Sequence, residues 1–305
     1  MNSAFDCIGD IHGYAGPLKA LLRKLGYELT GGTYAHPEGR KALFVGDYID
    51  RGPDIPEALS IVRSMAESGQ AIALMGNHEY NAVLFNTPKP GGGYLRPHNL
   101  KNFKQHAETL LQFQGQQALY EGYISWFRSL PLWWETENLR AVHASWDPAA
   151  LKVLKAQLPE GRLQAQQWAS LSNESSLLSQ ALETALKGKE ARLPDGLSFR
   201  DKDGHLRHEV RVKWWLETDG QPFEDISMQG GIDFPEGAVC GKLPGGHYGE
   251  MECPVFFGHY WLKGLPNLYR GNICCLDYSI AKGGYLAAYR FDGEQALQPE
   301  KWVYV

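Results

Sequence analysis

The feature that most constrains this chain is a glycine turn with two carboxylates, Asp47 and Asp50, directly after the apolar run at 42–45. The run predicts a buried strand, and carboxylates at the end of a buried strand must be paired, solvated or bound to cations. A Gly-Asp pair after a strand is also common in surface turns, so this turn alone establishes little. Its weight comes from the recurrence of the same pattern elsewhere in the chain.

Polar residues of metal-ligand type follow four further apolar runs. They occur at Gly9-Asp10-Ile11-His12, Gly76-Asn77-His78-Glu79, Ala141-Val142-His143 and Gly258-His259. In the first part of the chain such runs alternate with segments of helical periodicity, which predicts an α/β fold with ligands at the carboxyl ends of its strands. The sequence therefore predicts a two-metal site with Asp47 at its centre.

The ligand types narrow the choice of metal. Carboxylate and amide oxygens suit hard divalent cations, whereas imidazole suits Mn, Fe, Zn and Ni. Three candidate imidazoles, on His12, His143 and His259, favour two divalent ions that are Mn and/or Fe, with Zn, Ni or Mg as alternatives. Asp47 has two oxygens and can bridge ions about 3.5–4 Å apart, and two such ions activate water and hold phosphoryl oxygens.

Three residues beside these ligands have the chemistry of catalysis. His78 is a candidate general acid, Asp50 could orient its ring, and Arg51 could bind phosphate through two hydrogen bonds. Any one of the histidines alone would more often be structural, so the argument depends on the complete set. The remaining histidines are interpreted as surface or structural residues: His36, His98, His106, His205, His208 and His247.

Composition limits the class of protein. The 305 residues are 43% hydrophobic, which is enough for a sizeable core. We expect a single domain, 1–305, with a mostly helical cap or insertion at 148–235. The formal net charge of −5 and the lack of a basic stripe argue against a stable nucleic-acid partner.

The expected location is cytoplasmic. No apolar run approaches the roughly 20 residues of a membrane helix, so no membrane partner is expected. The chain enters a strand within a few residues, which predicts no signal peptide. Its five cysteines show no CxxC spacing and are expected to be reduced thiols.

Residues 86–98 contain three prolines and three consecutive glycines, just beyond the candidate catalytic turn at 76–79. Such a segment is either a mobile active-site loop or a plain connector between helices. Both interpretations stay open at this point.

The motifs at 9–13, 46–52, 76–79, 143 and 258–259 resemble, in this order, those of the calcineurin-like metallophosphoesterases. More narrowly they resemble the phosphoprotein-phosphatase branch of that family. The resemblance implies a two-layered β-sandwich flanked by helices and a reaction in which a metal-bridging hydroxide attacks without a phospho-enzyme.

The resemblance also implies roles for individual residues. His78, paired with Asp50, becomes the proton donor, and Arg51 becomes a phosphate ligand. One metal is assigned to Asp10, His12 and Asp47, and the other to Asp47, Asn77, His143 and His259.

Two features depart from the family pattern, one at Trp261 and one after His143, where Ala144-Ser145 replaces the usual Ala-Gly. Trp261 occupies the last position of the Gly-His-x-His motif of the wider superfamily, which leaves the first metal with fewer protein ligands. A second phosphate-binding arginine is expected, and the candidates are Arg200, Arg211 and Arg270.

The segment 283–288 resembles the closing hairpin of small diadenosine tetraphosphatase-like enzymes. The sequence therefore favours a hydrolase of phosphoric esters or anhydrides that acts on nucleotide polyphosphates such as diadenosine tetraphosphate. A serine/threonine or tyrosine phosphoprotein phosphatase, or an enzyme for a phosphorylated small molecule, is the alternative. A regulatory scaffold with the same fold would be marked by a missing ligand or a replaced His78, and neither is seen.

Overall fold

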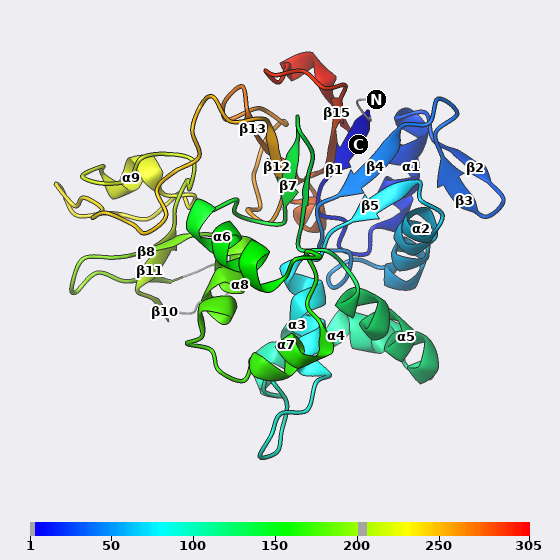
Figure 1. Ribbon diagram of the computed structural model, residues 1–305, viewed down its shortest axis with the longest axis horizontal. Helices are drawn as coiled ribbons and strands as arrows, with labels where there is room; N and C mark the ends of the chain where they lie inside the picture. Colours follow the sequence, from blue (N-terminus) through cyan, green and yellow to red (C-terminus); the bar gives the residue numbers. More distant parts are fainter. Residues whose placement is uncertain (1–3, 201–205) are drawn as a thin grey trace.

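The central strands are buried on both faces and form two sheets between helices (Figure 1). The computed structural model describes residues 4–200 and 206–305. On β1 (Phe5–Ile8) and β4 (Lys41–Phe44), Cys7 and Leu43 face one apolar cluster, whereas Ile8 and Phe44 face another. Successive side chains of a strand point to opposite faces, so each strand contributes to both clusters.

The first sheet joins residues from both ends of the chain. Its order is β14-β15-β1-β4-β5, and β16 also pairs with β15. The strands β1, β4 and β5 run parallel, whereas β15 runs antiparallel to β1, with Asp6 opposite Arg290. The remaining strands of this sheet are β5 (Ala71–Ala73), β14 (Asp277–Tyr278), β15 (Tyr285–Phe291) and β16 (Trp302–Tyr304).

The second sheet has the order β13-β12-β7-β6. Its strands β7, β12 and β13 run parallel, and β6 pairs with β7 in the antiparallel sense. Phe256 and Cys274 of this sheet pack with Cys7 and Leu43 of the first, so the inner cluster fills the space between the two layers. The strands are β6 (Trp133–Glu135), β7 (Arg140–Val142), β12 (Val255–Phe257) and β13 (Ile273–Cys275).

Helices cover the outer faces of both sheets (Figure 1). The helices α1 (Ala15–Lys24) and α2 (Ile55–Glu67) bury their apolar sides against the first sheet, and a hairpin of β2 (Glu28–Thr30) and β3 (Thr33–Ala35) lies between them in the sequence. The helical segment 99–130 forms α4 (Leu100–Gln112) and α5 (Gln117–Arg128), after α3 (Asn77–Phe85). The expected β-sandwich flanked by helices is confirmed.

The expected insertion at 148–235 is helical only in its first half. That half contains α6 (Pro148–Gln157), α7 (Ala165–Ser170) and α8 (Leu177–Lys187), whose apolar residues join the main core. Beyond Lys187 short paired strands take over and form a cluster of their own around Val210 and Phe223. These elements are β8 (Glu190–Arg192), β9 (Phe199–Arg200), β10 (Leu206–Arg207), β11 (Glu209–Arg211) and α9 (Phe223–Ile226).

The assignment of 148–235 as an insertion within one domain stays a prediction. The tryptophans Trp214 and Trp215 lie outside the separate cluster and pack on Phe257 of the second sheet. Within the described ranges, no helix has both the length and the apolar character needed to cross a membrane.

Candidate metal centre

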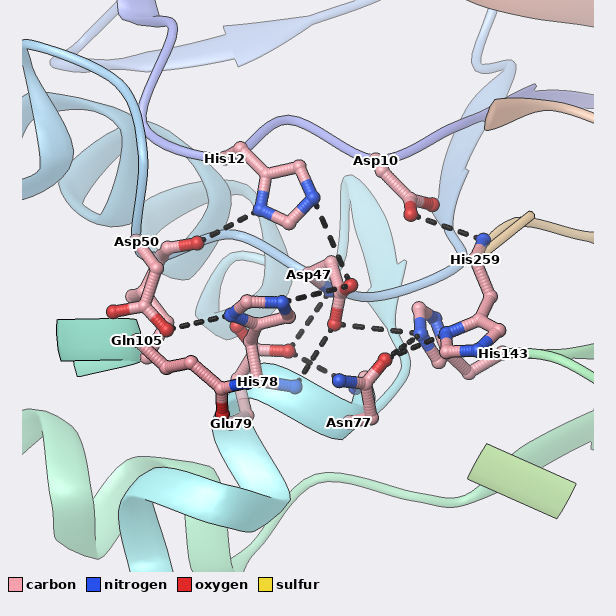
Figure 2. Close-up of polar contacts among 12 residues, drawn as sticks. Asp10, His12, Asp47, Asp50, Asn77, His78, Glu79, Gln105, His143 and His259 are labelled. Carbon is pink, nitrogen blue, oxygen red and sulfur yellow. Dashed lines mark hydrogen bonds and ion pairs between the residues drawn. The ribbon is translucent and has the colours of Figure 1, made fainter. Parts of the chain in front are cut away.

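The six candidate metal ligands meet where the parallel strands of the two sheets end (Figure 2). Asp10 and His12 follow β1, Asp47 follows β4 and Asn77 begins α3 just after β5. The second sheet contributes the other two, because His143 follows β7 and His259 follows β12. All six are buried, although they lie up to 249 positions apart in the sequence. Strand direction alone therefore gathers them at one edge of the sandwich.

Asp47 lies at the centre of this cluster. Its Oδ1 is 3.3 Å from His143 Nε2, and its Oδ2 is 3.8 Å from His12 Nε2 and 3.8 Å from His78 Nε2. Two groups of side chains could each hold a metal ion, one with His12 and His78 and the other with His143 and His259, and Asp47 belongs to both. A carboxylate shared in this way can bridge two cations.

Several buried atoms of the cluster lack a hydrogen-bond partner. They are Asp10 Oδ1, His12 Nε2 and His259 Nε2. The other ring nitrogen of His12 is 2.9 Å from the Ile49 carbonyl and must donate to it, which leaves an electron pair on Nε2. Because an unpaired buried polar atom is costly, these atoms fit metal ligands better than structural groups.

The surroundings of His143 fit a cation for a further reason. Its Nδ1 donates to the Val45 carbonyl at 2.9 Å, so its Nε2 carries an electron pair. That nitrogen is 3.0 Å from Asn77 Oδ1 and 3.3 Å from Asp47 Oδ1, both of which are electron-pair donors too. A cation bound among them would stabilise three such atoms that face one another.

The carboxylates of the cluster repel one another. Burial raises the pKa of Asp10 well above its ordinary value, and the charges of Asp277 and Asp47 raise it further. Burial and the charge of His78 lower the pKa of His12 to about 4, so this ring is neutral at pH 7 and can ligate a metal. Divalent cations would offset the repulsion between the carboxylates.

The turns that carry these residues are strained. In the part of the chain that the structure describes, seven residues other than glycine have a positive φ, and six of them lie in the turns of the cluster: His12, Asp47, Asp50, Arg51, His259 and Trp261. Two glycines are required for close approach. A Cβ on Gly46 would lie 2.6 Å from the backbone of Gly76, and one on Gly258 would lie 1.9 Å from Asp10 Oδ1. Strain of this kind is typical of functional sites.

Glu79 holds the central turn in place. Its carboxylate is buried and accepts hydrogen bonds from the backbone N–H groups of Asp47, Tyr48 and Gly76 at 2.9, 2.8 and 3.0 Å. The N–H of His78, in the first turn of α3, donates to Asp47 Oδ1 at 3.0 Å. The start of this helix therefore orients the central carboxylate as well as supplying candidate ligands.

His78 pairs with Asp50 through its Nδ1, which lies 2.5 Å from Asp50 Oδ2 (Figure 2). The other oxygen of Asp50 accepts from Thr109 at 2.5 Å and from His106 at 2.9 Å. Sequence reasoning missed both partners and left His106 among the structural histidines. Their spacing of three on α4 places them on one face of that helix, but no local signal links that face to a turn 56 residues earlier.

Asp277 was also missed. It follows β13 as the other ligands follow their strands, and it lies buried beside Asp10. Its carboxylate accepts from the N–H of Trp261 at 2.6 Å and from that of Ser279 at 2.9 Å, which fixes the turn after His259. The apolar run at 273–276 was the signal that could have found it.

Of the three candidates for a second phosphate-binding arginine, Arg211 is the one whose charge acts on the cluster. Burial lowers the pKa of His259 well below its ordinary value, and the charge of Arg211 lowers it further. Arg211 reaches this position from β11, where its Nε donates to the Lys187 carbonyl at 2.7 Å. Arg270 instead donates to the Tyr248 carbonyl at 2.7 Å and to Asn272 at 2.8 Å, while Arg200 is exposed on β9.

The segment 86–98 is tied to its surroundings by stacked rings. Tyr94 stacks on His98, and His98 stacks on Phe85 of α3, each with a centroid distance of 3.9 Å. Arg96 contacts Gln105 of α4. This anchoring does not decide between an active-site loop and a connector, and the role of the segment in substrate selection stays a prediction.

A family model described as calcineurin-like phosphoesterase matches residues 4–181, which is more than half of the chain. A bis(5'-nucleosyl)-tetraphosphatase described as symmetrical, from Methylobacillus flagellatus, is 25% identical over 95% of this chain and 93% of its own length. The asymmetrical bis(5'-nucleosyl)-tetraphosphatase PrpE of Oceanobacillus iheyensis is 31% identical, but the match covers 46% of this chain and only 54% of that relative.

Among solved structures, a cold-active protein tyrosine phosphatase is similar over 98% of this chain and 80% of its own, with a TM-score of 0.52. The sequence identity is 17%, so this likeness concerns the fold alone.

Proposed function

Because the chain belongs to the calcineurin-like phosphoesterase family, we propose that it hydrolyses phosphoric esters or anhydrides at a centre of two divalent cations. The observation that carries the proposal is the set of buried metal-ligand side chains that converge on Asp47, with ring nitrogens of His12 and His259 that have no hydrogen-bond partner. A scaffold that has lost activity would not need to keep this costly set complete. We place the enzyme in the cytoplasm, where its five free thiols stay reduced.

The proposed ligands form two sets that share Asp47. Asp10 and His12 would hold one cation, Asn77, His143 and His259 the other, and Asp47 both. Bound there, Mn or Fe ions would activate water and neutralise the oxygens of the phosphoryl group. The chain itself holds the donors in position through the strained turns and through Glu79.

The proposed proton donor is His78. Its Nδ1 is occupied by Asp50, so the ring is fixed with Nε2 directed toward Asp47 at the centre of the cluster. A proton on Nε2 could then pass to the oxygen of the leaving group. Arg51 is exposed at the end of the same turn, and we propose that it binds the phosphate together with Arg211.

The proposed substrates are nucleotide polyphosphates, and diadenosine tetraphosphate is the first to test. The tetraphosphatase that aligns with nearly the whole chain supports this choice. Phosphoprotein is the second candidate, because the motifs that carry the metal ligands resemble those of the phosphoprotein-phosphatase branch.

Metal removal tests the proposal directly. A chelator should abolish hydrolysis of p-nitrophenyl phosphate, and Mn should restore it better than Mg because three of the proposed ligands are imidazoles. The same preparations would be assayed with diadenosine tetraphosphate and with phosphoserine and phosphotyrosine peptides, to rank the substrates. Full activity in protein that elemental analysis finds free of metal would contradict the proposal.

A further inference from the structure

Two cations flank one tryptophan ring beside the proposed metal centre. The Cζ atom of Arg51 lies 5.6 Å from the centroid of the Trp261 ring, and Lys282 Nζ lies 4.9 Å from it. Because both distances end at one point, the two cations are separated by at most 5.6 plus 4.9 Å, or 10.5 Å. Within the described residues, neither Arg51 nor Lys282 forms a salt bridge with a carboxylate.

The tryptophan is fixed against the centre. The centroid of the Trp261 ring lies 5.3 Å from that of the His12 ring. The backbone N–H of Trp261 donates to the Asp277 carboxylate at 2.6 Å, and the residue has a φ of 55°. Lys282, at the end of the short 3₁₀ helix η1 (Ile280–Lys282), reaches the same ring from a separate segment. Arg51 and Lys282 are both exposed, and Trp261 is half-buried. The Trp261 ring thus contacts two cations that have no carboxylate partner, at the edge of the proposed metal centre.

We propose that Lys282, held at the Trp261 ring beside Arg51, forms a subsite for a second phosphate group of the substrate, next to the phosphate that Arg51 binds. The inference rests on the proposed function, since the first phosphate would lie over the metals. A chain with a net charge of −5 does not attract anions as a whole, so two unpaired cations beside the centre supply local attraction. Linked phosphates can contact both cations at once, whereas a phosphorylated side chain of a protein has one phosphate group. The subsite therefore selects polyphosphates.

The test compares inhibitors with one and three phosphates. Lys282→Gln should raise the inhibition constant of inorganic tripolyphosphate about tenfold relative to that of orthophosphate, because one charge-assisted contact is lost. The ratio of kcat/KM for diadenosine tetraphosphate to that for p-nitrophenyl phosphate should fall by a similar factor. Lys263→Gln, which changes an exposed lysine two residues after Trp261, is the matched control and should alter neither ratio.

Calorimetry of tripolyphosphate binding to metal-replete protein tests the subsite independently of whether the protein hydrolyses phosphate compounds. If the parent binds tripolyphosphate but hydrolyses nothing, the proposed function fails while the subsite stands. If Lys282→Gln weakens orthophosphate and tripolyphosphate equally, or weakens neither, the subsite is refuted.

A second inference comes from a buried hydrogen-bond chain behind Asp50. Asn86 Nδ2 lies 2.8 Å from the Ala82 carbonyl, which fixes the amide with its NH₂ group on that side. The same nitrogen is 2.7 Å from the Tyr120 hydroxyl and must donate to it. The hydroxyl is then free to donate to His106 Nε2 at 2.8 Å, and His106 Nδ1 donates to Asp50 at 2.9 Å.

We infer that this chain makes His106 and Tyr120 positioning residues for the catalytic pair. Every bond in this arrangement runs toward Asp50, whose second oxygen stays an acceptor for His78. His106 and Tyr120 are buried, and their rings lie 6.1 Å apart. This inference also rests on the proposed role of His78.

Substitutions at position 106 test the chain. His106→Leu removes the donor to Asp50 and should lower kcat about tenfold for a substrate with a poor leaving group, with KM and metal content nearly unchanged. The loss should be smaller with p-nitrophenyl phosphate, whose leaving group needs little protonation. His106→Asn, whose amide can replace the Nδ1 donor, should recover most of the difference.

A purely structural role for His106 predicts a different result. Both variants would then lower the melting temperature and reduce the two activities by the same factor. Equal losses for the two leaving groups, in protein that holds its metals, would refute a positioning role even if His78 itself proves catalytic.

Discussion

Replacing Asp47 by asparagine should release metal from both halves of the centre and lower kcat/KM for every phosphate substrate by about 10³-fold or more. Asp47 is the one residue common to the two groups that could hold a metal ion, and its side chain is buried. Asparagine has nearly the same shape, so the turn and its bonds to Glu79 can persist. The change removes the negative charge and one of the two bridging oxygens.

Elemental analysis of the purified variant gives the decisive measurement, since it does not depend on the choice of substrate. Asp54→Asn is a matched control, because Asp54 is an exposed carboxylate in the same part of the chain and its side chain makes no capping hydrogen bond to α2. The control should keep both ions. An Asp47→Asn protein that binds two ions with the affinity of the parent would show that the centre is not built around this residue.

Local sequence patterns were sufficient to predict where the strands end, but not how the strands are arranged in space. Each apolar run with a following Asp, Asn or His indicates a strand and a ligand at its end, because both features lie within a few residues. The division into two sheets depends on pairings such as Asp6 with Arg290, which no local pattern contains. The sandwich was expected only through the family resemblance.

The parts of the site that were missed are those that arrive from distant elements. His106 and Tyr120 lie on helices whose polar residues looked ordinary, and only the packing of α4 and α5 brings them behind Asp50. Which of the three candidate arginines acts on His259 was likewise not predictable, because Arg211 does so from β11, a strand whose pairing with β8 no local pattern contains. Packing determines such contacts, whereas the period of a single element does not.

The arrangement also explains why one turn contributes to two functions. Asp47 faces the proposed metals, and Asp50, three residues later, faces α4. Both residues have a positive φ, 56° for Asp47 and 65° for Asp50, which directs the two carboxylates to different partners. The cost of these conformations is offset by hydrogen bonds from Thr109 to Asp50 and from backbone N–H groups to Glu79.

The proposed acid role of His78 leads to the last prediction. His78→Asn should keep both metal ions and lower kcat by roughly 10²–10⁴-fold for a substrate with a poor leaving group, the range that one general acid contributes. The loss should be much smaller for p-nitrophenyl phosphate. His208→Asn, which changes an exposed histidine far along the chain, should have no effect and controls for the substitution itself.

Metal content distinguishes the acid role from its main competitor. His78 Nε2 lies 3.8 Å from Asp47 Oδ2, close enough for His78 to be counted with His12 and Asp47 as a possible metal ligand. If His78 were a ligand, the asparagine variant would lose an ion, and kcat would fall by the same factor for substrates with good and with poor leaving groups. If His78 is the acid, the variant keeps both ions, because His78 ligates neither of them. The loss in kcat then grows with the pKa of the leaving group, because the variant lacks only the proton that Nε2 would donate.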